Sequence, residues 1–373
     1  MRDSHNTIQM LPRYVATMPM PKLILIAALS ITACLSLPKK IAAEHTHVLI
    51  ISVDGLRPDA LNEPLLSLLP AFNRLLRGPH TLDARTDANF TVTLPNHLSM
   101  LTGRPVNGPE GHGWKLNTDP PGVTQGGSLH ANKGEYVSSV FDVAHDAGFS
   151  TMVAASKSKF WLLQQSYSWE HGRADATAPD HGPSKIDIFT FADDMEDLGG
   201  MVADRLARAN GPTLDFVHFA APDIAGHSYD WIVKADSKYF AAVIEVDRAL
   251  SLVLAAIDSN KHLRGATAII LTADHGGGVP LKTHTDPTCP LNFRIPFIVW
   301  LGDQVLEGDL YALNPSRARP VGDARSATAA KPIHNADAAN LALGLAGLPC
   351  IERSTFGFPT PLRVSPASNS QQP

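Results

Sequence analysis

Three mostly apolar runs, each followed closely by an aspartate, constrain the fold of this 373-residue chain more than any other feature. They span residues 47–53, 214–220 and 266–272, and they lead to Asp54, to Asp223 and to Asp274 with His275. A continuous apolar run is typical of a strand buried on both faces of a parallel sheet. Because such sheets bind ligands at their carboxyl edge, the runs predict an α/β fold with a mostly parallel sheet and a site where they end.

Further elements are predicted between and after these strands. Helices are expected at 70–77, 97–102, 136–147 and 235–257, and further strands at 150–155 and 293–301. The composition, 44% hydrophobic and 18% charged, is that of a globular protein, and we assign 44–364 to one catalytic domain. Within this domain, 104–185 is partly irregular, which predicts a small cap or loop insertion.

The first 43 residues have the pattern of a removable leader. Arg13 and Lys22 precede an apolar stretch at 23–37, and small residues follow it, as in a signal peptide. Because the stretch is short for a membrane span, we expect export to the periplasm or the medium, with no transmembrane domain after leader removal. Two alternatives stay open: a retained amphiphilic anchor, and a lipobox-like run that would make Cys34 a lipid anchor.

Charge and cysteine content narrow the choice of partners. The net charge is −5, and no basic run is long enough to indicate a surface for a nucleic-acid polymer. Cys289 and Cys350 are the only cysteines after the leader, and the sequence leaves open whether they pair or stay free. Residues 365–373 are polar and are predicted to be disordered.

A hydroxyl-bearing run at 91–97, Thr-Val-Thr-Leu-Pro-Asn-His, supplies two candidate nucleophiles, Thr91 and Thr93. A threonine hydroxyl is a poor nucleophile at neutral pH and needs a base or a metal ion to activate it. The Asp and His residues at the strand ends, without cysteine, suit Zn²⁺, with Mn²⁺ or Fe²⁺ as alternatives. The residues therefore predict a metal-activated threonine, but composition does not choose between the two.

Four motifs occur in a fixed order along the chain. They are Ser52-Val53-Asp54-Gly55, Thr93-Leu94-Pro95-Asn96-His97, Pro222-Asp223-Ile224-Ala225-Gly226-His227 and Thr272-Ala273-Asp274-His275-Gly276-Gly277. With these motifs the chain resembles the alkaline phosphatase superfamily, closest to bacterial type I phosphodiesterases and nucleotide pyrophosphatases. The resemblance implies a three-layer α/β/α sandwich with a mostly parallel central sheet, and it selects Thr93 as the nucleophile.

The same resemblance implies two zinc ions and a phosphothreonine intermediate. One ion would be held by Asp54, Thr93, Asp274 and His275, and the other by Asp223, His227 and a later histidine. We expect that histidine to be His284, because its position shortly after Asp274–His275 and before the strand at 293–301 matches the order that the resemblance implies. His334, which we expect to cap a helix, is the alternative. His97 and His112 are predicted to support the site without binding metal.

Three further residues bear on the substrate. Asn117 resembles the family asparagine that donates to a non-bridging phosphate oxygen. Lys157 and Lys159 follow the strand at 150–155 and resemble a lysine pair that holds the substrate in phosphonoacetate hydrolases and some phosphomonoesterases; two solvated lysines are the alternative.

We predict a phosphoric ester hydrolase for small molecules, with phosphodiesters or nucleotide pyrophosphates ahead of monoesters and phosphonates. A sulfatase is disfavoured, because its nucleophile lies in a Cys/Ser-x-Pro-x-Arg run that this chain lacks. A non-catalytic binding protein on the same fold would be expected to lack a ligand or the nucleophile, and the sequence retains them all.

Overall fold

The computed structural model describes residues 45–122, 125–173, 182–302, 304, 306–326 and 330–365. The predicted leader with Cys34, and the predicted tail beyond residue 365, lie outside these residues. Within the described part of the chain, no helix is both long enough and apolar enough to cross a membrane.

A sheet of seven strands forms the centre of the described residues. The strands are β1 (His47–Val53), β2 (His80–Arg85), β3 (Ser150–Ala155), β4 (Ile188–Phe191), β5 (Thr213–Phe219), β6 (Thr267–Thr272) and β7 (Arg294–Trp300). Their order is β2-β7-β6-β1-β5-β3-β4. Neighbours from β6 to β4 are parallel, whereas β7 is antiparallel to both β6 and β2. The prediction of a mostly parallel sheet is confirmed.

The register of the three central strands brings the predicted site residues to one edge. Val53 of β1 pairs with Phe219 of β5, and Ser52 of β1 pairs with Thr272 of β6. Asp54, which directly follows β1, therefore lies at the same edge of the sheet as the residues that follow β5 and β6. All residues of β5 and β6 are buried, as the mostly apolar runs predict.

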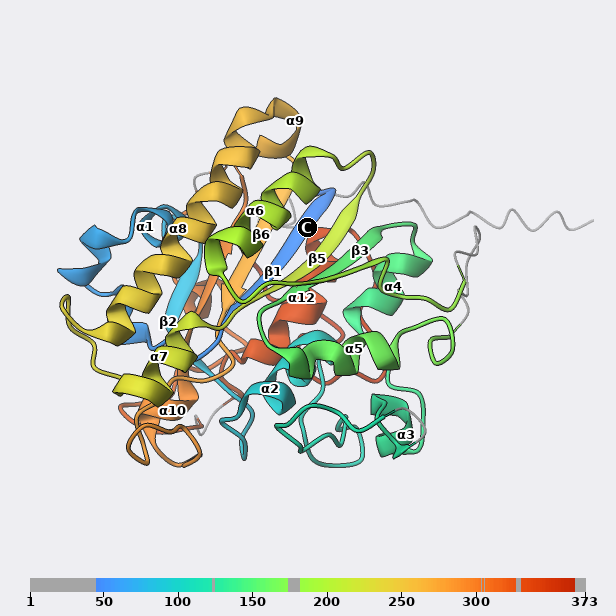
Figure 1. Cartoon of the computed structure of the whole chain (residues 1–373), viewed down its shortest axis with the longest axis horizontal. Helices are drawn as coiled ribbons and strands as arrows, with labels where there is room; N and C mark the ends of the chain where they lie inside the picture. Colours follow the sequence, from blue (N-terminus) through green and yellow to red (C-terminus); the bar gives the residue numbers. More distant parts are fainter. Residues whose placement is uncertain are drawn as a thin grey trace, which may run out of the picture. The chain divides into compact units, whose positions relative to one another are not determined.

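Helices cover both faces of the sheet. On one face, α1 (Pro70–Leu75), α6 (Met195–Ala207), α7 (Ala221–Tyr229) and α8 (Lys238–Ser259) pack together, with α6 and α8 in front of the strands in Figure 1. The other face carries α2 (Thr93–Thr102), α4 (Val140–Asp146) and α12 (Ala338–Leu345), which also contact one another. The predicted three-layer arrangement is therefore confirmed.

The remaining helices are short. The α-helices are α3 (Leu129–Lys133), α5 (Trp161–Ser166), α9 (Lys261–Arg264), α10 (Pro290–Phe293) and α11 (Leu310–Leu313), and the 3₁₀ helices are Pro58–Leu61, Leu65–Leu68, Ser158–Phe160 and Asn335–Asp337. Helix α4 begins at Val140, later than the expected residue 136, because Ser139 and Asp142 form a capping box at that point.

Candidate active site

Thr93 is the first residue of α2, at the carboxyl edge of the sheet, and its side chain is buried. Its hydroxyl oxygen lies 3.5 Å from Nε2 of His275. His97, one turn later, donates from Nδ1 to the carbonyl oxygen of Thr93, and the Ser52 hydroxyl donates to His97 Nε2 at 2.8 Å. Both ring nitrogens of His97 are thus used, and its Nδ1 holds the backbone of Thr93 in place.

The first cluster of candidate metal ligands comes from the ends of β1 and β6. His275 Nε2 lies 3.4 Å from Asp54 Oδ1 and 3.1 Å from Asp274 Oδ2. Backbone N–H groups of Gly55 and His275 donate to the other oxygen of Asp274, Oδ1, which turns Oδ2 toward the imidazole. The structure therefore brings Asp54, Asp274 and His275 together beside Thr93.

The second cluster joins α7 to the loop before α10. Asp223 and His227 are four residues apart, so they lie on one face of α7, with Nε2 of His227 3.4 Å from Asp223 Oδ1. His284 Nε2 lies 3.6 Å from the same oxygen and 3.2 Å from His227 Nε2. The ring of His284 also stacks on that of His275, with centroids 3.6 Å apart, so the two clusters adjoin.

The hydrogen bonds of the three histidines fix which nitrogen carries the proton. Nδ1 of His275 faces the Gly276 carbonyl, Nδ1 of His227 faces that of Lys282, and Nδ1 of His284 faces that of Thr91. Because a carbonyl oxygen only accepts, each Nδ1 carries a hydrogen and each Nε2 presents a lone pair to the site. A backbone partner on the far nitrogen is the usual way in which proteins orient metal-binding histidines.

Three carboxylate oxygens complete this arrangement. Asp54 Oδ1, Asp223 Oδ1 and Asp274 Oδ2 are buried and have no hydrogen-bond partner among the described residues. Each of these oxygens lies within 3.6 Å of an imidazole Nε2 that presents a lone pair and carries no hydrogen. Buried acceptors that face one another without a donor are unfavourable unless a cation lies between them. The residues present therefore fit divalent metal ions.

The electrostatics of the site favour the metal-binding protonation state of His275, His284 and Asp54, whereas Asp274 needs a nearby cation to stay ionised. Burial lowers the pKa of His275 and of His284, which keeps both rings neutral. Burial opposes ionisation of Asp54, but the Lys157 ammonium and a hydrogen bond from His218 hold the pKa of Asp54 well below its usual range. Burial and the charge of Asp54 raise the pKa of Asp274. Neutral imidazoles and carboxylates are the protonation states in which these side chains bind metal.

Lys157 and Lys159, which follow β3, have different partners. Lys157 Nζ lies 2.7 Å from Asp54 Oδ2 and 2.5 Å from Asp223 Oδ2, so it bridges one carboxylate of each cluster. Lys159 Nζ donates to the backbone and side-chain oxygens of Asn117, at 2.9 and 3.3 Å. The backbone N–H of Leu94 also donates to Asn117 Oδ1, which ties this loop to the first turn of α2.

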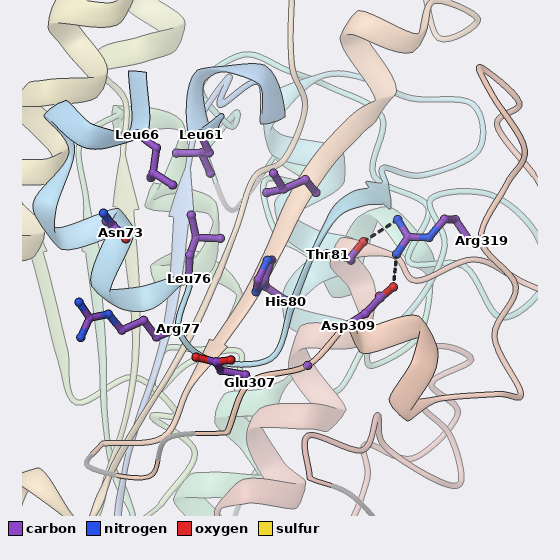
Figure 2. A pocket seen from close by; sticks show the side chains of 12 residues that line it. Leu61, Leu66, Asn73, Leu76, Arg77, His80, Thr81, Glu307, Asp309 and Arg319 are labelled. Carbon is purple, nitrogen blue, oxygen red and sulfur yellow. Dashed lines mark hydrogen bonds and ion pairs between the residues drawn. The ribbon is translucent and has the colours of Figure 1, made fainter. Parts of the chain in front are cut away.

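A cavity of about 540 Å³ opens over these residues. Its lining includes Thr93, Asn117, Lys157, Lys159, Asp223, His227 and His284 from the predicted site, together with Ser156, Ser158, Phe191, Ile224 and Ser228. A larger cavity, of about 790 Å³, lies between α1, β2 and the chain around Asp309 (Figure 2). Arg319 joins Thr81 and Asp309 on its wall, and no predicted site residue lines it.

Other predicted residues lie outside the two clusters. His334 donates from Nδ1 to the Thr86 carbonyl and caps the 3₁₀ helix that starts at Asn335. His112 is fully buried between Pro95 and Trp114. Cys289 and Cys350 are free thiols, which answers the question of their pairing.

His218 is the residue near the site that the sequence reasoning missed. It is fully buried in β5, and its Nε2 lies 2.9 Å from Asp54 Oδ2. The signal was present, because a histidine within an apolar strand needs a polar partner, and the strand ends beside Asp54 are the nearest source of one.

Comparisons with known proteins identify the family and the fold of this chain. A sequence profile of the type I phosphodiesterase/nucleotide pyrophosphatase family matches residues 48–279. The chain belongs to this family. The match covers more than half of the chain and includes all four motifs. The chain is therefore an enzyme of a metal-dependent family that hydrolyses phosphoric esters.

Solved structures show the same fold at low sequence identity. The lipoteichoic acid synthase LtaP from Listeria monocytogenes is 13% identical with a TM-score of 0.57, over 87% of this chain and 78% of that one. An alkaline phosphatase superfamily protein from Vibrio parahaemolyticus is 16% identical with a TM-score of 0.53, over 86% and 71%. These likenesses establish the alkaline phosphatase-like fold.

Proposed function

We propose that this enzyme is a two-zinc hydrolase that acts through a phosphothreonine intermediate on Thr93, with phosphodiesters or nucleotide pyrophosphates as its substrates. One cation would be held by Asp54, Thr93, Asp274 and His275, and the other by Asp223, His227 and His284. The same donors also accept Mn²⁺ or Fe²⁺.

One observation carries the proposal: lone pairs of three imidazole Nε2 atoms and three buried carboxylate oxygens converge beside the Thr93 hydroxyl. The separation of 3.2 Å between Nε2 of His227 and Nε2 of His284 illustrates the point, because neither nitrogen has a hydrogen to share. Such a pair is stabilised by a shared cation. His334 has no comparable place, since its ring caps a helix.

The residues of the chain support an in-line displacement. When bound, the two cations would lower the pKa of the Thr93 hydroxyl and stabilise charge on the leaving oxygen. Thr93 Oγ1 attacks phosphorus, the bond from phosphorus to the leaving oxygen breaks, and a phosphothreonine remains. Water then attacks the same phosphorus and restores the hydroxyl. The position of Thr93 in the first turn of α2 favours the anion throughout, because the helix N-terminus carries partial positive charge.

Asn117 is oriented to donate to the phosphate. Its Oδ1 accepts from the Leu94 N–H and from Lys159, so the side-chain amide group, Nδ2, is turned away from these donors. Nδ2 has no protein partner among the described residues, and Asn117 lines the cavity with Thr93. A positioned amide donor of this kind stabilises charge that develops on a non-bridging oxygen.

The partners of the lysines support diesters over monoesters. The charge of Lys157 is compensated by Asp54 and Asp223, so it adds less attraction for a dianion than a free ammonium group would. Lys159 is the reason to keep a second candidate, a phosphomonoesterase or phosphonoacetate hydrolase-like activity. Its ammonium lies in the cavity wall next to Asn117, where it could contact a second negative charge.

The nucleophile is tested by Thr93→Ala, measured together with metal analysis. We expect about two zinc ions per chain in the wild type, turnover lost in Thr93→Ala with most of the metal retained, and partial activity in Thr93→Ser. Full activity in Thr93→Ala would show that the nucleophile is misassigned. A wild-type protein without metal, whose turnover is unaffected by chelators, would contradict the mechanism.

The substrate class is tested by rates on a nitrophenyl diester, a nitrophenyl monoester and phosphonoacetate, measured side by side for the wild type, Lys157→Ala and Lys159→Ala. We expect the diester to be hydrolysed fastest, with Lys159→Ala changing the monoester rate more than the diester rate. A wild type that prefers the monoester or the phosphonate, and loses that preference in Lys159→Ala, would favour the second candidate.

A further inference from the structure

His218 makes contacts on both sides of its ring. It lies on β5 between β1 and β3, paired with Ser52 on one side and Ala155 on the other. Its Nε2 lies 2.9 Å from Asp54 Oδ2, and its Nδ1 lies 3.4 Å from the Ser156 backbone nitrogen. The ring thus connects the end of β3 to the carboxylate at the end of β1.

The partners of His218 define its tautomer. The ionised carboxylate of Asp54 only accepts, so Nε2 must carry the hydrogen and donate it to Oδ2. The Ser156 N–H only donates, so Nδ1 accepts from it and carries no hydrogen. The ring therefore has one donor and one acceptor, and each has a partner.

The surroundings hold the ring in this orientation. Phe160 lies against it with ring centroids 4.3 Å apart, and His97 meets it edge-on at 5.0 Å. The side chain is fully buried, so no water competes for Nε2. A ring that contacts two aromatic neighbours and is bonded at both nitrogens cannot turn without breaking a buried contact.

The hydrogen bond from His218 also determines which oxygen of Asp54 faces His275. His218 and Lys157 both donate to Oδ2, which leaves Oδ1 without a partner and 3.4 Å from His275 Nε2. Lys157 has a flexible side chain that is 16% exposed and shared with Asp223, whereas His218 is a rigid ring within the sheet. The fixed donor is therefore His218.

We propose that His218 is a positioning residue that orients Asp54 for metal binding by donating Nε2–H to Oδ2, which directs Oδ1 toward the metal. This inference rests on the proposed function, in which Asp54 is a ligand. Partners that orient a ligand in this way commonly contribute about 10- to 100-fold to metal affinity.

Two amide variants separate the two sides of the ring. In His218→Gln, the amide nitrogen reaches the place of Nε2 and can still donate to Asp54, but the acceptor for Ser156 is lost. In His218→Asn, the amide reaches only as far as Nδ1, so a contact with Ser156 is retained and the donor to Asp54 is lost. Phe216→Leu, a change in the same strand in a residue that contacts His97, is the control for general disturbance of the core.

The test is the affinity for Zn²⁺, measured by competition with a chromophoric chelator, together with the absorption spectrum of the Co²⁺-loaded protein. We expect about a 10- to 100-fold loss of Zn²⁺ affinity and an altered Co²⁺ spectrum in His218→Asn, with His218→Gln within about threefold of the wild type. Phe216→Leu should lower the melting temperature without either change. Equal affinities in the wild type and both His218 variants, or equal losses in both variants, would overturn the positioning role alone. A wild type that binds no metal would overturn the proposed function as well.

Discussion

His112 allows a direct test of how burial of a neutral histidine near the site makes the stability of the protein depend on pH. Its Nε2 donates to the Pro95 carbonyl at 3.1 Å, and its Nδ1 accepts from the Trp114 N–H at 3.2 Å. A second proton could only be placed on Nδ1, where it would face the Trp114 N–H. Burial lowers the pKa of His112 to about 3 accordingly.

The size of the effect follows from linkage. In the unfolded chain a histidine has a pKa of about 6.5, so below that pH the unfolded state binds a proton that the folded state rejects. Stability is therefore lost as the pH falls below about 6.5, and the loss stops growing near the folded pKa of about 3. Between pH 7 and pH 5, His112 should lower the free energy of unfolding by about 2 kcal/mol.

The perturbation that isolates this contribution is His112→Asn. Asparagine does not titrate, and its side-chain oxygen can still accept from the Trp114 N–H, while the bond to Pro95 is lost. At pH 7 we expect the variant to be less stable by about 1 to 3 kcal/mol, because the Pro95 carbonyl is left without its donor.

The assay is urea denaturation of both proteins at pH 7 and at pH 5. The fall in the free energy of unfolding between these two values should be smaller in His112→Asn than in the wild type by about 2 kcal/mol. The control is His262→Asn, a change at an exposed residue of α9, which should leave the fall in the free energy of unfolding between pH 7 and pH 5 as it is in the wild type. An equal fall in the wild type and His112→Asn would refute the reasoning.

Three further predictions test other parts of the molecule. Burial raises the pKa of Asp215 in β5 to about 7 against the opposing charge of Arg205, so ionisation of this carboxyl group lowers stability as the pH rises from about 4 to 7. Between pH 5 and pH 8, urea denaturation should show the free energy of unfolding of Asp215→Asn rising by about 2 to 3 kcal/mol relative to that of the wild type, and no relative rise would contradict the raised pKa. Metal analysis should find about one zinc ion per chain in His284→Ala and about two in His334→Ala, and the reverse result would exchange their roles. Gly55 has φ 73°, and a Cβ there would lie 3.0 Å from the Cα of Asp223. Thermal denaturation should therefore show that Gly55→Ala lowers the free energy of unfolding by about 2 kcal/mol or more, whereas unchanged stability would mean that the backbone relaxes.

The carboxyl edge of the sheet was predictable because it depends on a strong and local signal. The runs that became β1, β5 and β6 are mostly apolar, and a strand buried on both faces needs that composition. Parallel strands then place their following residues at one edge, whatever their distance in the sequence. The sequence alone therefore groups Asp54, Asp274 and His275.

Helix α7 was not predicted, and the reason is a tertiary contact. Its sequence contains Pro222 and Gly226, which are poor signals for a helix. A Cβ at Gly226 would lie 2.3 Å from the ring of Trp231, so the glycine is required by close packing rather than by a turn. The four-residue spacing of Asp223 and His227 gains its meaning only from this helix, because it places both side chains on one face.

The edge strands and His218 were missed for related reasons. Strands β2 and β4 lie at the two ends of the sheet and are only partly buried, so neither has a continuous apolar run. His218 lies inside a run that was predicted correctly, but the partner of a buried polar group depends on which strands are neighbours. Strand order β1-β5-β3 brings His218 beside Asp54 and Ser156, and no local pattern encodes that order.

The partners of Lys157 could not be predicted from the spacing of residues in the sequence. The sequence places Lys157 and Lys159 at the correct edge, where both were expected to face the substrate or the solvent. The head groups of long side chains are set by the charges within reach, however, and Lys157 reaches one carboxylate from each ligand cluster. Lys159 has no carboxylate partner among the described residues, and its hydrogen-bond partners are the oxygens of Asn117. Because a monoester carries one more negative charge than a diester, the proposed preference between them rests on the partner of a single ammonium group, which the Lys-x-Lys spacing cannot specify.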